Sequence, residues 1–582
     1  MISLTDWNTI NSRMIAKSLQ ELTYEQVLNP RALDKRDETT VGAYELKLSS
    51  GVHYSFTAWR GVWTDLKVQA SSILRNGQRV PDAGQFFIDI QKETGMDDII
   101  LANFLEEMHN TLYADLNILQ RSRHFTSHQL TSMNGEELQS FLQGHPKILL
   151  NKGRMGWSAA DQELYGPEFK KPIQFIWLAV DRTLCLAGLD EDLQQEDLLK
   201  ECMQNLSDFK KELAKKSVDE AKYFFLPVHP WQWERYIKIQ FASFLHSGHI
   251  QCLGFWGDHY VPQISLRTFS NISRPEKLDV KLPITILNTS AIRGIPGKYM
   301  RQGPALSRAL TKLCRDDEQL ASVCVLEEKA GLSVTHPLYQ KVSAAPYRYH
   351  EFLGVLWRQS SAFHLRHDEK AILAGSLFHV DENGQSLMGA YVQSSGLSMS
   401  EWLTCYFKNI VIPLYHLQVR YGVGLVAHGQ NVVVRLKNHT PTGIFLKDFQ
   451  GDLRLSQDSK VLSEFDLTRL PKHYLIHDLL TGHLVTVLRF ISETLQECDM
   501  YPEDEFYALL GQCLQKYGQD NAALTNAPDF QSIDLLQEKF HRVLVNKVRF
   551  KIGYADSAER PLPILGDDLI NPIARSLKKV SV

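Results

Sequence analysis

The sequence predicts an α+β protein in which antiparallel sheets are combined with helices. Three observations carry this prediction. The first segment repeats apolar residues at helical spacing, whereas residues 259–271 and 279–294 are β-branched, roughly alternating and bounded by turn residues. Near the C-terminus, two strand-like runs flank a polar turn within residues 423–452, and helical patterns dominate after Lys472. Adjacent strands joined by short turns pair antiparallel, so sheets of this kind are expected.

Length and charge narrow the class of protein. The chain has 582 residues with 63 Lys+Arg against 67 Asp+Glu, a net charge of −4, and 44% hydrophobic residues. Such a chain can bury about three or four cores, which excludes disorder and fibrous repeats. The balanced charge argues against a general nucleic-acid or anionic-membrane binder, so we expect neither partner. Any anion site must come from locally clustered cations.

Cysteine usage and the lack of apolar spans indicate a cytoplasmic protein. The eight cysteines are scattered without a C-x-x-C pair, which fits buried free thiols in a reducing compartment. The N-terminus lacks a basic region followed by an apolar core. The longest uncharged window, residues 239–257, is broken by polar residues and glycine and is a poor membrane span.

Three units are expected along the chain. Residues 1–143 are mostly helical, with a first helix capped by Thr5 or Asp6, a strand around residues 44–48, and helices over about 84–143. Residues 144–395 mix strands and helices, including a helix at 347–357. Residues 396–582 hold a helix ending at Gly422, the hairpin 423–452 and a helical remainder.

The hairpin carries a candidate metal site. Asn431 begins its first strand and Asp448 ends its second, so folding at the turn 437–443 brings the two side by side. An amide oxygen with a carboxylate suits Mg²⁺ bound to nucleotide phosphates, and protein kinases use an analogous pair. The D-F-x-G sequence at 448–451 only approximates the kinase motif. An ordinary polar hairpin end is the alternative.

Two further clusters could bind anions. Ser265, Arg267 and Thr268 are expected on one strand, with Arg267 on the face of Ser265, and the next run supplies Lys281, Thr289, Ser290 and Arg293. Hydroxyls with guanidinium and ammonium groups suit a triphosphate or carboxylate, although surface charges can have the same pattern. The segment 144–157 adds His145, Lys152 and Arg154 among glycines, as an anion site or a basic surface turn.

These clusters, in this order, resemble the NRPS-independent siderophore (NIS) synthetase family. The matching pieces run through most of the chain: GHP…K-x-R-x-G at 144–156, HPWQW at 229–233, SLRT at 265–268, K-L-P-I-T…T-S-x-R-G at 281–294, AHGQN at 427–431 and KDFQG at 447–451. The resemblance implies thumb, fingers and palm subdomains around one deep cleft, for 1–143, 144–395 and 396–582, and a homodimer.

The resemblance implies ATP-dependent amide synthesis. A citrate-derived carboxylate attacks the α-phosphate of ATP, releases pyrophosphate and forms an acyl-adenylate, from which an amine displaces AMP. The implied catalytic residues are Arg267, Lys281, Arg293 and His428, and Mg²⁺ is held by Asn431 and Asp448. The implied ATP site comprises Ser265, Arg267, Thr268, Lys281, Thr289, Arg293, His428, Gln430, Asn431 and Asp448.

Two departures from the family pattern indicate which acid the protein accepts as its substrate. Many members have a second His-Pro where this chain has Ile148 and Leu149, and a Glu where it has Val426. We expect both changes to leave apolar groups in the acyl-substrate region, which favours a bulkier citryl monoamide over free citrate. The implied acyl-substrate residues are His145, Lys152, Arg154, Arg293 and Arg549, the last chosen over Lys547 and Lys551.

The leading hypothesis is therefore a synthetase that joins N6-acetyl-N6-hydroxylysine to its citryl conjugate. Within the family, another citrate- or succinate-derived acid is the alternative. Outside it stand a kinase-like phosphotransferase built on Asn431 and Asp448, which would give ADP, and a non-catalytic carboxylate-binding protein, which would turn over no ATP.

Overall fold

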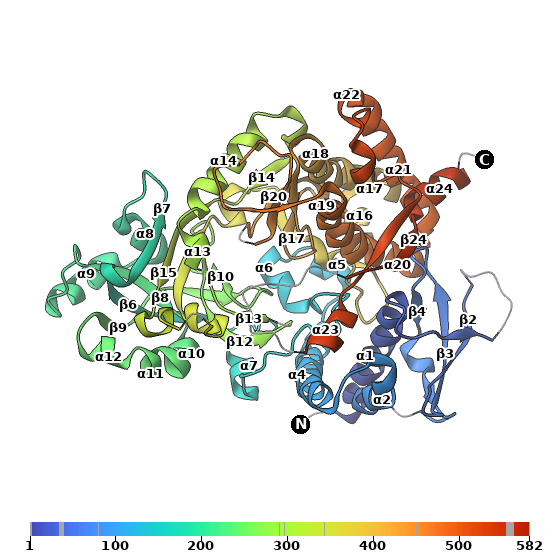
Figure 1. The fold of residues 1–582 in the computed structure, drawn as a ribbon, viewed down its shortest axis with the longest axis horizontal. Helices are drawn as coiled ribbons and strands as arrows, with labels where there is room; N and C mark the ends of the chain where they lie inside the picture. Colours follow the sequence, from blue (N-terminus) through green and yellow to red (C-terminus); the bar gives the residue numbers. More distant parts are fainter. Residues whose placement is uncertain are drawn as a thin grey trace.

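Three large buried apolar clusters and two small ones form the core of the described residues. The computed structural model describes residues 3–33, 40–79, 81–289, 291–295, 297–342, 344–449, 451–553 and 564–580. In Figure 1 the N-terminal part lies at the lower right, the C-terminal part above it, and the central part with its large sheet at the left. The sheets are mostly antiparallel, which confirms the α+β fold class.

The N-terminal unit packs helices on a small sheet. Its first helix begins after Ser3, whose side chain accepts a hydrogen bond from the Asp6 amide; the predicted caps Thr5 and Asp6 were therefore wrong, because both lie inside the first turn. The predicted strand at 44–48 is confirmed as β2, with Tyr44 and Leu46 buried. The elements are α1 (Leu4–Tyr24), β1 (Arg31–Ala32), β2 (Gly42–Lys47), β3 (His53–Arg60), β4 (Leu66–Val68), β5 (Leu74–Arg75), α2 (Ala83–Asp89), α3 (Gln91–Thr94), α4 (Asp98–Ser122), α5 (Ser127–Leu130) and α6 (Gly135–Leu138).

The central unit is built on an eight-stranded antiparallel sheet in the order β7-β15-β16-β11-β10-β9-β6-β8. A short separate hairpin, β12 with β13, projects beside it. The strands are β6 (Ile173–Asp181), β7 (Cys185–Leu189), β8 (Tyr223–Val228), β9 (Ile250–Pro262), β10 (Thr268–Asn271), β11 (Asp279–Lys281), β12 (Ile284–Asn288), β13 (Ala291–Arg293), β15 (Glu328–Val334) and β16 (Leu353–Arg358). The helices include α7 (Ala159–Tyr165), α8 (Gln195–Cys202), α9 (Leu206–Lys215), α10 (Pro230–Gln232), α11 (Lys238–Gln240), α12 (Ala242–His246), α13 (Gly297–Met300), α14 (Gly303–Arg315) and α15 (Pro337–Gln340).

Two sequence predictions fail in this unit. Ser265 and Arg267 do not lie on a strand: they form the turn between β9 and β10, and Leu266 between them has a φ of +67°. The predicted helix 347–357 is a single helical turn at 347–350 followed by β16. Every residue of β16 is buried, so both faces of the strand are covered. Its apolar run therefore lacks the alternation that identifies a strand.

The C-terminal unit combines the predicted hairpin with a helical bundle. The helical stripe ends at Gly422, which adopts a left-handed φ of +62°, as predicted. The hairpin turns at Asn438 and His439, both with positive φ, so Thr440 already belongs to the second strand. The elements are β14 (Val323–Val325), β17 (Glu369–Leu373), α16 (Leu387–Ser395), α17 (Met399–Tyr406), α18 (Ile412–Tyr421), β18 (Val423–Leu425), β19 (Val432–Lys437), β20 (Thr440–Leu446), β21 (Leu453–Ser456), β22 (Thr468–Leu470), α19 (Lys472–Leu479), α20 (Arg489–Cys498), α21 (Glu503–Asp520), α22 (Ala522–Thr525), β23 (Lys539–Leu544), α23 (Asn546–Ile552), β24 (Ile564–Ile570) and α24 (Pro572–Val580).

One helical stretch is long and apolar enough to cross a membrane by length and composition. Among the residues that the structure describes, it runs over Lys472–Cys498, and 83% of its most apolar 18-residue window is buried inside the protein, where it packs in the core of the C-terminal bundle. All eight cysteines are free thiols, in keeping with the absence of a disulfide framework from the sequence.

The three units share elements across their junctions. β17, from before residue 396, pairs with β19, and β14 pairs with β20. α23 returns to the N-terminal unit, where the rings of Phe550 and Phe104 lie 5.7 Å apart, and Figure 1 shows it beside α4. The boundaries at 143 and 395 stay predictions, and the described contacts place β14 and β17 in the sheet of the C-terminal unit.

Candidate active site

A cavity of about 330 Å³ lies where the three units meet. It is lined by nearly all of the residues that the sequence motifs single out: His145, Lys152, Arg154, Ser265, Arg267, Lys281, Thr289, Arg293, His428, Gln430, Asn431 and Asp448. Thr268 and Arg549 are outside this lining, and Ser290 lies outside the described residues. The cavity therefore unites motifs that are far apart in the sequence.

Asp448 is surrounded by cations. Its Oδ1 accepts a hydrogen bond from the Lys281 ammonium at 2.7 Å and lies 3.2 Å from an Arg358 nitrogen, while its Oδ2 is 3.7 Å from the Lys447 ammonium. Burial alone would raise the pKa of Asp448, but Lys281, Arg358 and Lys447 hold it well below its usual range. The carboxylate stays ionised at any physiological pH.

Asn431 is held by Asp452, and the strand register does not set it directly across from Asp448 as the sequence predicts. The pairing of Val432 with Leu446, continued by one residue, sets Asn431 across from Lys447 and out of step with Asp448. The Asn431 amide nitrogen donates to the Val426 carbonyl at 3.0 Å and to Asp452 Oδ2 at 3.2 Å. With both donors engaged, the amide oxygen is left as an acceptor, and Asp452 joins Asp448 and Asn431 in the cavity lining.

Two further cations of the lining come from the β9–β10 turn and the β12–β13 hairpin. The Arg267 guanidinium donates to the Gly294 carbonyl, and Arg293 donates to the Asn288 carbonyl at 2.7 Å. Ser265 Oγ accepts a hydrogen bond from the amide of Thr268, so Thr268 supports the turn from behind. These contacts hold two guanidinium groups of the cavity lining in place.

Two histidines in the cavity are neutral and are held in matching tautomers. Nδ1 of His145 accepts from the Ile148 amide, and Nδ1 of His428 accepts from the Gln430 amide, both at 3.2 Å. Burial lowers the pKa of both imidazoles, and the rings lie 6.2 Å apart. A neutral imidazole that accepts at Nδ1 carries its proton on Nε2, so each ring can donate to a bound carboxylate or phosphate oxygen.

Lys152 and Arg154 are already paired with acidic groups. Lys152 lies 2.9 Å from Asp115, and Arg154 makes a two-pronged, buried ion pair with Glu168 at 2.7 and 2.9 Å. Arg549 likewise pairs with Glu107, away from the cavity lining. These contacts leave less positive charge for a ligand than the sequence suggests, and the assignment of the three to the acid stays a prediction.

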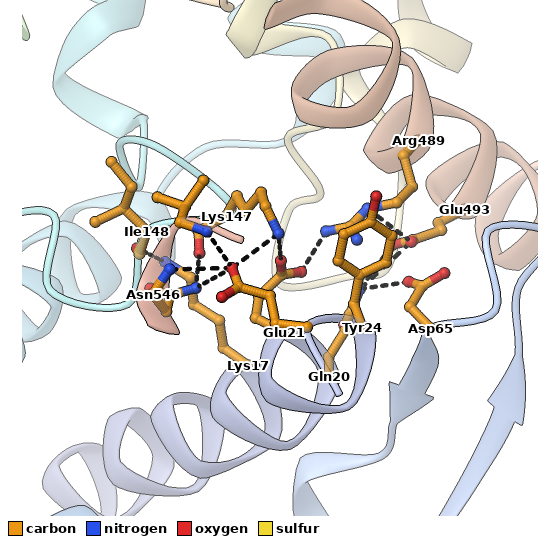
Figure 2. Close-up of polar contacts among 12 residues, drawn as sticks. Lys17, Gln20, Glu21, Tyr24, Asp65, Lys147, Ile148, Arg489, Glu493 and Asn546 are labelled. Atoms are coloured by element: carbon orange, nitrogen blue, oxygen red, sulfur yellow. Dashed lines mark hydrogen bonds and ion pairs between the residues drawn. The ribbon is translucent and has the colours of Figure 1, made fainter. Parts of the chain in front are cut away.

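A buried polar network holds the loop that carries His145 (Figure 2). The Lys147 ammonium lies 3.0 Å from Glu25 and 3.4 Å from Glu21, and all three side chains are fully buried. Lys17 donates to the backbone carbonyls of His145 and Ile148. The network ties this loop to α1.

The same network reaches the C-terminal unit. Arg489 on α20 pairs with Glu21, and the Asn546 amide donates to Glu25 and to the Lys147 carbonyl, both at 3.0 Å. Gln20 extends the network to Asp65 and Glu493 (Figure 2). Residues more than 300 positions apart thus fix the position of His145.

Four residues other than glycine that line the cavity have a left-handed backbone. Arg154, Leu266, Thr289 and Asp448 have φ values of +40°, +67°, +49° and +64°, and all four line it. Such conformations are uncommon for residues other than glycine and cluster at functional sites. The turn at Leu266 interrupts the predicted strand, and Thr289 and Asp448 come after strands have ended. Alternation alone therefore places these residues incorrectly.

The two departures from the family pattern lie in different places. Val426 lines the cavity, as expected for an apolar replacement near the acyl substrate. Ile148 and Leu149 do not line it: Leu149 packs in the N-terminal core, and Ile148 serves through its backbone. The expectation that they line the acyl-substrate region was wrong, because the lining contributed by this loop stops at Pro146 and resumes at Asn151.

Comparisons with known proteins identify the family. Residues 136–379 match the IucA/IucC family, and residues 400–557 match the family described as ferric iron reductase FhuF-like transporter. The aerobactin synthase of Escherichia coli is 38% identical over 579 residues, covering 98% of each chain. The chain belongs to the IucA/IucC family. This membership confirms the NIS-synthetase resemblance, and the identity of 38% over nearly the whole chain supports the likeness to aerobactin synthase within it.

Solved members of the IucA/IucC family share this fold. Aerobactin synthetase IucC from a hypervirulent pathotype of Klebsiella pneumoniae is 35% identical and superposes with a TM-score of 0.86 over 98% of this chain and 99% of that one. ATP-bound aerobactin synthetase IucA from the same pathotype superposes with a TM-score of 0.73 at 15% identity, over 98% and 100%, and so shows the fold alone.

Several residues of this IucA/IucC-family site escape sequence reasoning. Asp452 holds Asn431, Arg358 faces Asp448, and Glu168 neutralises Arg154. Arg358 ends the apolar run of β16, and a charge at the end of a buried strand could have indicated it. Asp452 and Glu168 lie in loops, where no periodic pattern exists to read.

Proposed function

We propose that the chain is an ATP-dependent amide synthetase that adenylates a citryl hydroxamate acid and condenses it with N6-acetyl-N6-hydroxylysine to give aerobactin. Membership of the IucA/IucC family carries the coarser statement, a siderophore-biosynthetic ligase acting on small molecules. The observation that supports the finer one is the single cavity in which Arg267, Lys281 and Arg293 face Asp448 and Asn431.

The cationic side of the cavity fits a nucleotide triphosphate. Adenylation moves negative charge onto the departing pyrophosphate, and fixed cations stabilise that charge without reorganising during the reaction. Arg267 and Arg293 are held by backbone carbonyls, so they are positioned in advance. The Lys281 ammonium donates to Asp448, and it can exchange this partner for a phosphate oxygen. The ATP-bound IucA structure supports ATP use at the level of the fold.

The residues opposite fit magnesium. Asp448 is ionised, and the Asn431 amide is turned so that its oxygen is available, which gives two hard oxygen ligands of the kind that Mg²⁺ takes alongside substrate phosphates. When bound, Mg²⁺ would offset phosphate charge. Asp452 orients Asn431 through its hydrogen bond to the amide nitrogen.

The apolar Val426 supports an acid larger than citrate. It lines the cavity close to His145 and His428, whose Nε2 protons can donate to a carboxylate. An uncharged wall there disfavours the additional carboxylate of free citrate, because burying that charge unpaired is costly.

We also propose that the protein is cytoplasmic and forms a homodimer. Light scattering coupled to size-exclusion chromatography checks the homodimer.

One assay tests the proposal. Purified protein is incubated with ATP, Mg²⁺ and a matrix of acids and amines, with pyrophosphate, AMP and ADP measured separately and products identified by mass. We expect AMP and pyrophosphate with the citryl-lysine hydroxamate and N6-acetyl-N6-hydroxylysine. Preference for free citrate or a succinyl acid would indicate another member of the family, ADP a phosphotransferase, and no turnover a binding protein.

A further inference from the structure

A second cavity of about 170 Å³ adjoins the first. His145, Val426, His428 and Arg454 line both, so the two spaces meet at this shared wall. Nothing in the adenylation chemistry described above uses the second space. Its position next to the two histidines makes it the natural place for a molecule that must reach the activated acyl group.

The walls of the second cavity are mainly apolar. Leu470, Val543, Val545 and Leu565 come from β22, from β23 and the residue after it, and from β24, and Tyr474 on α19 completes this side. Such a lining suits an aliphatic chain with few polar groups. It does not suit a nucleotide or a tricarboxylate, which need charged or hydrogen-bonding partners throughout.

One buried carboxylate stands out in this lining. Asp478 is 3% exposed, and its Oδ1 accepts a hydrogen bond from the Arg454 guanidinium at 2.8 Å. Its Oδ2 is buried and has no hydrogen-bond partner among the described residues. An unsatisfied buried carboxylate oxygen costs stability and marks a place where a ligand donor fits.

The backbone places Asp478 next to the shared wall. The Ala427 amide donates to the Asp478 carbonyl at 3.1 Å, which sets α19 against the segment carrying Val426 and His428. Gly424 leaves room for the carboxylate: a Cβ there would lie 2.7 Å from Oδ2. A side chain at position 424 would therefore displace the carboxylate.

We propose that the second cavity binds the methylene chain of the acyl acceptor, N6-acetyl-N6-hydroxylysine, and that Asp478 accepts the proton which the α-amine of this acceptor loses during attack. This inference rests on the proposed function. The amine nitrogen forms a bond to the acyl carbon, the bond from that carbon to the AMP oxygen breaks, and AMP leaves with the electron pair. The nitrogen's proton passes to Asp478 Oδ2, so atoms and charge balance.

The electrostatics of Asp478 suit this role. Burial raises its pKa to about 7 against the attraction of Arg454, and Asp452 adds to the rise. A base with a pKa near the working pH combines a useful unprotonated fraction with a strong pull on the proton. Arg454, which lines both cavities, holds the carboxylate through the hydrogen bond to its Oδ1.

Two variants separate the acceptor subsite from the adenylation site. Asp478→Asn keeps the shape and can still accept from Arg454, and Val545→Phe fills the apolar part. Acid-dependent ATP–pyrophosphate exchange, measured without amine, reports adenylation and folding together. Hydroxylamine is the control nucleophile, because it is small enough to trap the acyl-adenylate without occupying the second cavity.

We expect both variants to keep exchange and hydroxylamine trapping within about twofold of the unmodified chain. Asp478→Asn should lower kcat for condensation with N6-acetyl-N6-hydroxylysine by about 10²-fold, the usual scale for losing a general base. Val545→Phe should raise the KM for that amine about tenfold with kcat little changed.

Each contrary result has a distinct meaning. Absence of exchange in the unmodified chain would overturn the proposed function itself. Normal exchange with unchanged condensation in both variants would overturn the subsite alone. Loss of exchange together with condensation in Asp478→Asn would assign Asp478 a structural role and overturn its part in proton transfer.

Discussion

Replacing Lys147 by Met should destabilise the protein and impair use of the acid. Lys147 is fully buried between Glu25 at 3.0 Å and Glu21 at 3.4 Å, and its ammonium lies 4.2 Å from the centre of the Tyr24 ring. Removing one member of a buried ion cluster leaves charge uncompensated and costs about 3–5 kcal/mol.

The expected cost is at the low end of that range, about 3 kcal/mol, because both carboxylates keep other partners. Glu25 still accepts from the amides of residues 545–547 and from the Asn546 side chain, and Glu21 still pairs with Arg489. Since Lys147 is two residues from His145, the KM for the acid should also rise about tenfold, which corresponds to ~1.4 kcal/mol of binding energy.

Urea denaturation followed by near-ultraviolet circular dichroism measures the first effect, and pyrophosphate release at varied acid and fixed ATP measures the second. Lys211→Met is the matched control: the same exchange at a lysine whose side chain is 71% exposed should leave both quantities unchanged. If Lys147→Met has the same unfolding midpoint and the same KM as this control, the network does not position His145.

Three further predictions test other parts of the structure. Arg293→Ala should lower kcat/KM for pyrophosphate release by about 10²–10³, whereas Arg315→Ala, at an exposed site, should not; near-normal release in Arg293→Ala would remove it from the site. Val426→Glu should reduce kcat/KM for the citryl conjugate at least about tenfold by burying a charge, and an unchanged product profile by mass would contradict the role of this wall. Burial raises the pKa of Glu503 to about 7 from 4.5, so its contribution to stability is present below pH 4.5 and is lost as the pH rises through 7. Glu503→Gln should flatten this decline by up to about 1.4 kcal/mol per pH unit in urea titrations at pH 5, 6 and 7, and parallel curves would refute it.

Helices and strands whose apolar residues recur at a clear period could be predicted from the sequence, as could the motifs that occur in a specific order. The first helix and the strand at Tyr44 follow from patterns in which one face is buried and the other is not, whereas the helix end at Gly422 and the hairpin at 423–452 follow from their turn residues. β16 was read as a helix because both its faces are buried. Periodicity reports the difference between two faces, and a strand without such a difference gives no signal.

The candidate site was predicted as a set of residues and not as a set of contacts. Sequence motifs gathered the cavity lining almost completely, yet they could not show that Glu168 neutralises Arg154 or that Asp452 holds Asn431. Those partners come from loops whose positions depend on the packing of other units. The turn at Ser265 was missed for a related reason, since a positive φ at Leu266 breaks an otherwise regular alternation.

The buried contacts between Lys147 and Asn546 also determine when the protein can become active during its synthesis. A ribosome adding about 5–20 residues per second needs roughly 20–80 s to pass from the His145 loop to Asn546. Throughout that interval Glu25 and the Lys147 carbonyl lack the partner that completes their hydrogen bonds. We therefore expect a chain truncated before Asn546 to leave Glu25 and the Lys147 carbonyl without this partner, and to hold the loop that carries His145 less firmly, however well its first two units fold.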